Sequence, residues 1–276
     1  MRHKAIAAAI SAVLALTSGA AAAQGLGIMA LGDEGPFTAP AIDFATGELD
    51  AARIDRADLK GDDLRRYSVV WWHDGDTDPG ELTGGEIDAL VNYAEAGGSI
   101  LLTAWAIRYA TPMGLEGAEA RQFGPTPADG INVGITVMEE TVDLGLVDGM
   151  VDIDGDPPKA GVRVQVNSTG FPKSGDYFDT IWTNFITLAG AWGPPGDDWT
   201  DRIAAFGYWE AGAGKVFNMN WRLPTYHENN EDIEQLQQLT SNVIGWLEVE
   251  SAFRSVEAGG KLPVTWGRLR RERVTR

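Results

Sequence analysis

Residues 67–114 constrain the fold more than any other part of the chain. The apolar and β-branched run at residues 67–72 predicts a strand that is buried on both faces. Thr83 and Glu86 have the spacing of a helix N-cap and its capping box, and apolar residues follow at helical spacing until a Gly-Gly pair. A second buried run at residues 99–103 completes a β-α-β unit. Such a unit requires parallel strands.

The carboxyl ends of these strands are the predicted site, because open parallel sheets bind ligands there. His73 and Asp74 follow the first strand, and Trp105 follows the second. His227 and Glu228 precede the last predicted helix. A histidine titrates near neutrality and can act as a base or a metal ligand. The alternative is structural: His73 bonds its own loop, and Glu228 caps the helix.

Aromatic residues near this edge and in the loop around residues 190–200 are candidates for sugar binding. Exposed aromatic faces stack on the apolar faces of sugar rings. In the alternative interpretation, the same rings pin the loops to the protein body. The ligand-binding candidates are Trp72, His73, Trp105, Trp192, Trp199 and Tyr226.

The N-terminal residues predict export. A basic start, an apolar stretch and small residues up to Ala23 form a secretory leader, with cleavage expected between Ala23 and Gln24. The apolar run is short for a membrane anchor, and no other stretch is apolar enough to span a bilayer. We expect a leader at residues 1–23, one domain at 24–250 and a basic tail at 251–276. The mature protein is then secreted, periplasmic or on the cell surface.

Composition excludes several classes of function. The chain has no cysteine, which rules out disulfides, thiol catalysis and cysteine-bound metals. Its net charge of −18 would repel nucleic acid and anionic lipid. A high-salt habitat and an ordinary acidic secreted protein both fit this charge. The expected partner is a glycan or small sugar, or a cell-surface protein.

Two acidic clusters are candidate calcium-binding sites, and calcium is the one candidate cofactor. Asp152, Asp154 and Asp156 have the spacing of an EF-hand opening, although Pro157 and Arg163 break that pattern. The second cluster comprises Asp74, Asp76, Asp78 and Glu81. The alternative for each is a solvated acidic turn.

The rest of the pattern completes an α/β chain. Residues 49–64 favour a helix or a short extended segment, and residues 170–196 an ordered surface excursion. Predicted strands lie at residues 25–31, 133–140 and 162–166, a β-hairpin at 202–210 and 214–221, and a helix at 229–250.

Three stretches carry a resemblance to a known superfamily: YSVVWWHDG, LTGGEIDALVNYAEAGGSILLTA and GAGKVFNMNWRLPTYHENNEDIEQLQQLTSNVIGWL. They resemble the class I glutamine amidotransferase-like superfamily, especially its ThuA-like (trehalose-utilisation-protein-like) branch. They are also similar to uncharacterised domains of secreted Bacteroidota-type glycan-utilisation proteins. The resemblance implies a flavodoxin-like three-layer sandwich, with a mainly parallel sheet and an added antiparallel β-hairpin.

The resemblance also implies lost catalysis. Amidotransferases carry a nucleophilic cysteine at the strand-to-helix elbow and a His-x-Glu after the late strand. Here residues 102–106 read LTAWA, and His227 and Glu228 are adjacent. Glutaminase activity is therefore not expected.

Three hypotheses follow. The first is a secreted, catalytically degenerate amidotransferase-like domain that binds a carbohydrate or a partner protein. The second is a sugar-processing or other hydrolase that uses His73, Asp74, His227 and Glu228, with or without a metal. The third is a structural interaction module on the cell surface.

Overall fold

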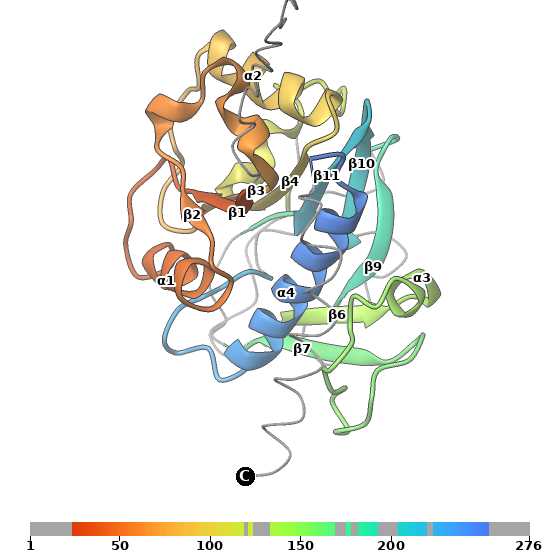
Figure 1. The fold of residues 1–276 in the computed structure, drawn as a ribbon. Helices are drawn as coiled ribbons and strands as arrows, with labels where there is room; N and C mark the ends of the chain where they lie inside the picture. The colour runs from red at the N-terminus through yellow and green to blue at the C-terminus, as the bar shows by residue number, and fades with distance from the viewer. Residues whose placement is uncertain are drawn as a thin grey trace, which may run out of the picture.

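The computed structural model describes residues 24–118, 121–123, 133–168, 175–177, 182–192, 204–219 and 223–253. The predicted leader and residues 254–276 of the predicted tail lie outside these ranges. In the described part of the chain, nine strands form one mixed sheet and two more form a small separate sheet. Helices cover the large sheet, so the fold class is α/β (Figure 1).

One half of the large sheet is parallel, as the β-α-β unit predicted. In spatial order it contains β2 (Ala52–Arg53), β1 (Gln24–Met29), β3 (Tyr67–Asp74), β4 (Ser99–Ala104) and β11 (Gly214–Met219). Every residue of β3 and β4 is buried, which confirms the two strands covered on both faces. Their carboxyl ends meet at one edge, where His73 pairs with Thr103 and Asp74 pairs with Ala104.

The other half is antiparallel, so the expectation of a mainly parallel sheet is not confirmed. Next to β11 come β10 (Ala204–Ala211), β9 (Ile186–Trp192), β6 (Val133–Val137) and β7 (Arg163–Asn167), each antiparallel to its neighbour. The predicted hairpin is β10 and β11. Its short turn, with Gly212 at φ 63°, joins only antiparallel strands. Because β11 also pairs with β4, the hairpin lies inside the sheet and reverses the strand direction there.

Helices on both faces complete the three layers of a flavodoxin-like fold (Figure 1). Helices α1 (Ala39–Glu48) and α4 (Ile233–Glu250) bury their apolar residues in one core. The short helix η2 (Gly61–Arg66), α2 (Gly84–Glu95) and η3 (Trp105–Ala110) contribute to the core on the other face. The remaining elements are η1 (Arg56–Asp58), α3 (Glu139–Asp143), and the small sheet of β5 (Arg121–Phe123) and β8 (Gly175–Tyr177).

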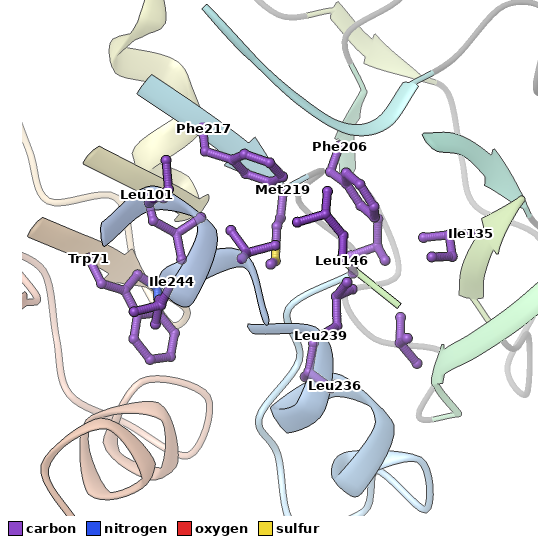
Figure 2. Close-up of a cluster of buried hydrophobic side chains, with 14 of the residues drawn as sticks. Trp71, Leu101, Ile135, Leu146, Phe206, Phe217, Met219, Leu236, Leu239 and Ile244 are labelled. Carbon is purple, nitrogen blue, oxygen red and sulfur yellow. The ribbon is translucent and has the colours of Figure 1, made fainter. Parts of the chain in front are cut away.

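The larger core joins the two halves of the sheet through α4. Figure 2 shows side chains of α4 between those of the parallel strands and those of the antiparallel strands. Their burial holds the two halves of the sheet together, because apolar area removed from water is the main stabilising contribution. The labelled members are Trp71, Leu101, Ile135, Leu146, Phe206, Phe217, Met219, Leu236, Leu239 and Ile244.

Local sequence signals fixed the ends of α2. The Thr83 side chain accepts a hydrogen bond from Glu86 N at 3.3 Å, and Glu86 Oε2 accepts one from Thr83 N at 2.7 Å. This reciprocal pair is the predicted capping box. At the other end, a Cβ on Gly98 would lie 2.2 Å from the Tyr93 ring, so only glycine fits there.

Three segments were missed or read only loosely from the sequence. Helix α1 was not predicted, although Thr38 and Pro40 stand where helices begin. Strand β9 lies in the segment that was interpreted as a surface excursion, yet it is partly buried. Residues 49–64 form β2, η1 and η2 instead of a single element. In these cases burial by distant segments decided the structure, and the local pattern was weak.

Candidate functional site

Asp74 joins two loops at the carboxyl edge of the parallel strands. Its Oδ1 accepts hydrogen bonds from Leu31 N at 2.8 Å and from Gly32 N at 2.7 Å. Its Oδ2 accepts one from the Trp72 indole N–H at 2.5 Å. Burial raises the pKa of Asp74, and these hydrogen bonds oppose the rise. The carboxylate is thus committed to holding the end of β1 against β3.

Asp76 makes a second connection at the same edge. Its Oδ2 accepts a hydrogen bond from Thr38 N at 2.8 Å, just before α1. In return, Thr38 Oγ1 accepts hydrogen bonds from Gly75 N at 2.9 Å and from Asp76 N at 3.2 Å. The loops after β1 and β3 are therefore locked to each other by groups that sequence spacing could not pair.

His73 is fully buried, and both of its ring nitrogens have partners. Nε2 lies 3.1 Å from the carbonyl oxygen of Phe37, and Nδ1 lies 2.9 Å from Thr103 Oγ1. A carbonyl only accepts, so Nε2 carries the proton, and Nδ1 of the neutral ring is an acceptor that faces the Thr103 hydroxyl, whose single proton also faces the carbonyl oxygen of Trp72 at 3.1 Å. Burial lowers the pKa of His73 to about 4, which keeps the ring neutral at pH 7. In this conformation His73 links the loop after β1 to β4 and contacts no solvent.

His227 is half-buried, and its ring packs against the ring of Phe37, the residue whose carbonyl oxygen contacts His73. Its ring centroid lies 4.8 Å from that of Phe37, and its Nδ1 accepts a hydrogen bond from Asn229 N at 3.1 Å. Glu228 is exposed and lies outside α4, which begins four residues after Asn229. The structure thus brings both histidines to Phe37, which contacts His73 through its backbone and His227 through its ring.

Of the aromatic candidates, two are core residues. Trp72 is fully buried, with its ring 4.6 Å from that of Tyr109. Tyr226 is 2% exposed and shares a 2.5 Å hydrogen bond with Thr240. Neither ring presents a free face to a ligand. Trp199 lies outside the described residues, and for Trp192, the last residue of β9, only the backbone is described.

The turn from β4 into η3 is strained. Ala104 has φ 55° and ψ −128°, and in the described chain only Asp50 shares a positive φ among residues other than glycine. Such a conformation costs on the order of 1–3 kcal/mol and clusters at functional sites. A strained strand-to-helix turn is also the geometry that exposes a nucleophile in α/β hydrolases. Here the residue is alanine, followed by the half-buried Trp105, whose ring lies 5.6 Å from the Arg108 guanidinium.

Both acidic clusters are engaged by hydrogen bonds and ion pairs within the protein. Asp152 Oδ1 accepts hydrogen bonds from the backbone nitrogens of Asp154 and Asp156, both at 2.9 Å. In the second cluster Asp78 forms an ion pair with Arg108. Over the described residues, no group of three or more histidine or acidic side chains is arranged to hold a metal ion. The calcium hypothesis therefore gains no support from this geometry.

Sequence reasoning missed two buried polar residues on the face that η3 covers. Glu116 is 5% exposed, and its carboxylate accepts hydrogen bonds from the Trp209 indole N–H at 3.0 Å and from Asn184 N at 2.8 Å. Asn218, on β11, is fully buried, and neither atom of its amide has a hydrogen-bond partner. In sequence, Glu116 resembles a loop residue and Asn218 an ordinary strand residue, so no local signal marked them.

Comparison with known proteins identifies the class of fold. No protein-family model and no curated protein sequence matches the chain. A ThuA-like protein from Bacteroides uniformis is similar in structure, with a TM-score of 0.55, 11% identity, and coverage of 86% of this chain and 96% of that one. A cytoplasmic protein from Salmonella typhimurium has a TM-score of 0.48 at 11% identity, covering 81% and 99% of the two chains. A ThuA-like protein from Parabacteroides merdae has a TM-score of 0.48 at 12% identity, covering 82% and 90%.

The fold is therefore that of ThuA-like proteins, a class I glutamine amidotransferase-like fold. This confirms the resemblance carried by the three sequence stretches. At 11% identity the likeness establishes the fold and leaves the activity open. Among the described helices, none is both long and apolar enough to span a bilayer.

Proposed function

We propose that this protein is a secreted, catalytically degenerate amidotransferase-like domain that binds a neutral carbohydrate beside Ala104 and Trp105. The observation that carries the proposal is the strained turn at Ala104. A conformation of this kind is retained only where the surrounding structure imposes it. Its side chain is a methyl group, which cannot attack a substrate. A turn that has this backbone conformation but lacks a nucleophilic side chain favours binding over catalysis.

The surrounding groups also argue against acyl transfer. The chain has no thiol, and the nearest hydroxyl along β4, that of Thr103, is already engaged. Its oxygen accepts a hydrogen bond from the Trp71 indole N–H at 2.8 Å and is hydrogen-bonded to His73 Nδ1 at 2.9 Å. With a pKa of about 4 and no exposure, His73 is a poor general base at neutral pH. A nucleophile and a base within reach of a substrate are both missing from these residues.

Half-buried aromatic rings at the same edge support a carbohydrate ligand. Trp105 follows the strained residue directly, and the rings of Phe37 and His227 pack against each other at a tilt of 37°. Aromatic faces of this kind pack against the C–H faces of sugars. The net charge of −18 disfavours an anionic ligand and is indifferent to a neutral one.

Calorimetric titration tests the proposal. Leader-free protein is titrated with glucose, maltose and cellobiose and then screened on an array of common polysaccharides. We expect binding that weakens about tenfold in Trp105→Ala, a loss of roughly 1.4 kcal/mol. The matched control is Tyr208→Ala, which removes a half-buried ring from β10 in the antiparallel half.

The outcomes separate the versions of the hypothesis. No binding of any sugar by the wild-type protein would refute the carbohydrate version, and capture of one defined cell-surface protein would then favour the partner version. Equal weakening by Trp105→Ala and Tyr208→Ala would move the site away from Ala104. Incubation with glutamine should release no ammonia.

A hydrolase is the second candidate, because His73 and His227 approach the same phenylalanine. His73 and Asp74 are fully occupied by structural hydrogen bonds, so this alternative depends on His227 and Glu228. Hydrolysis of a sugar that disappears in His227→Asn would favour it over the binding function.

A further inference from the structure

Asn218 is a buried amide without a hydrogen-bond partner. Its exposure is 0%, and both the amide nitrogen and the amide oxygen are unpaired. Buried polar groups are normally paired, because an unpaired one has lost its water and gained nothing. In the described part of the chain, the other unpaired buried side-chain atom is Thr136 Oγ1, on β6.

Strand register places this amide close to the strained turn. Asn218 pairs with Leu102 on β4, two residues before Ala104. Paired residues of neighbouring strands share a face, and so do residues two apart in one strand. The side chains of Asn218 and Leu102 therefore lie on one face of the sheet, and the strained Ala104 stands two positions further along β4. This is the face that η3 covers over β4.

On its other side, Asn218 pairs with Gly207 of β10. A Cβ on Gly207 would lie 2.7 Å from the ring of Phe185 and 2.2 Å from the carbonyl oxygen of Ile186. An aromatic ring thus occupies the space next to the amide. Asn218 is thus a polar group between an apolar strand residue and an aromatic ring, which are kinds of residue that line small-molecule sites.

The chemistry of the amide selects the ligand. A carboxamide offers a donor and an acceptor side by side, and a sugar hydroxyl likewise both donates and accepts. Two carboxylates lie on the same face: Asp74 beside Ala104, and Glu116 through its bond to Trp209. The Arg108 guanidinium beside Trp105 is already paired with Asp78, so these carboxylates disfavour an anion.

We propose that Asn218 hydrogen-bonds a hydroxyl group of the neutral sugar that binds beside Ala104. This inference rests on the proposed function and adds a residue that recognises the ligand by hydrogen bonding. A fully buried amide is reached only when its cover shifts. Next to β11, β4 is covered by η3, which is six residues of 3-10 helix, longer than such helices usually run, and starts from a strained residue.

The test compares two nearly isosteric replacements of unpaired polar groups. Asn218→Leu removes the amide, and Thr136→Val removes the other unpaired atom three strands away, at a distance of about 14 Å. Each variant is melted without ligand and titrated with glucose, maltose and cellobiose. We expect neither melting temperature to fall, since each replacement removes an unpaired buried group. Asn218→Leu should bind at least tenfold more weakly, and Thr136→Val should bind like wild type.

Two results overturn the assignment of Asn218 and leave the proposed function intact. One is equal sugar affinity in wild type and Asn218→Leu. The other is equal weakening in Asn218→Leu and Thr136→Val. If wild-type protein binds no sugar, both the proposed function and this inference fail. Should Asn218→Leu not fold, Asn218→Ala adds no atoms and carries the same binding comparison.

Discussion

Glu248 gives the most quantitative prediction about this protein. It lies near the end of α4, and its Oε1 is 3.0 Å from the position that a Cβ on Gly25 would occupy, at the start of β1. Burial alone raises the pKa of this carboxyl from 4.5 to about 7. The fold therefore holds a carboxyl group that is easier to bury protonated than ionised.

The sign and size of the effect on stability follow from linkage. Between pH 4.5 and 7 the native protein keeps the proton that the unfolded chain has released, so this group lowers stability as pH rises through that window. A pKa difference of this size corresponds to at most about 3 kcal/mol of unfolding free energy, lost in full above pH 7. Glu248→Gln does not titrate, so it should keep that free energy.

Urea unfolding at about pH 5 and about pH 8 measures the effect, using protein in which a short neutral extension precedes Gln24, so that no α-amino charge lies beside Gly25. We expect Glu248→Gln to gain up to about 3 kcal/mol relative to wild type between the two pH values. Subtracting the two chains removes contributions from all other groups, including His73. Glu48→Gln, at the exposed end of α1, is the matched control and should gain nothing.

A parallel shift of the wild-type and Glu248→Gln unfolding curves between the two pH values would refute the reasoning. It would show that the carboxylate is solvated or has a cationic partner in solution. A gain of equal size in Glu48→Gln would also refute it, because the effect would then come from net charge and not from burial.

Three further predictions use the same stability assays. Because the pKa of His73 falls from 6.5 to about 4 on folding, its contribution to stability should be lost as pH falls through that window. His73→Leu should lack this pH dependence and should lose about 2–4 kcal/mol of unfolding free energy at pH 7, because its hydrogen-bond partners are left unpaired. Melting both proteins at pH 7 and pH 5 tests this, and an unchanged pH dependence in His73→Leu would contradict it. Thr83→Ala should cost about 1 kcal/mol by removing the cap of α2, whereas Thr83→Ser should cost little; equal losses would argue against the hydroxyl. Glu116→Ala should lose about 2–4 kcal/mol of unfolding free energy in urea titrations, because the Trp209 N–H and two backbone N–H groups are left without acceptors. Glu116→Gln should lose less. Unchanged stability in Glu116→Ala would mean that water replaces the carboxylate.

Much of the scaffold was readable in the sequence because its signals are local. The run at residues 67–72 became a strand buried on both faces, and Thr83 and Glu86 formed their capping box. The apolar stripe of α4 and the hairpin of β10 and β11 appeared as predicted. Periodicity, caps and tight turns involve residues only a few positions apart, so a single sequence carries them.

The site depended on contacts that no local pattern encodes. The partners of His73, at Phe37 and Thr103, lie 36 and 30 residues away in the chain, and the two backbone partners of Asp74 Oδ1 lie more than 40 residues away. The strained dihedral angles fall on Ala104, a residue that normally avoids them, and Asn218 is unpaired only because of what surrounds it. Burial and hydrogen bonding of these groups are properties of the packed molecule.

By itself, the sequence determined the β-α-β scaffold and the absence of any thiol, and it carried the resemblance to ThuA-like proteins whose fold the structure shows. It predicted the antiparallel hairpin of β10 and β11 but could not determine that β9, β6 and β7 extend it into an antiparallel half of the sheet, because strand order is set by long-range pairing. Only the tertiary structure decided that His73 is fully buried, that the turn at Ala104 is strained, and that Asn218 on the neighbouring strand is buried without a hydrogen-bond partner. The physical reason is that local propensity fixes the elements, whereas packing fixes which polar groups are satisfied and which are left to bind something else.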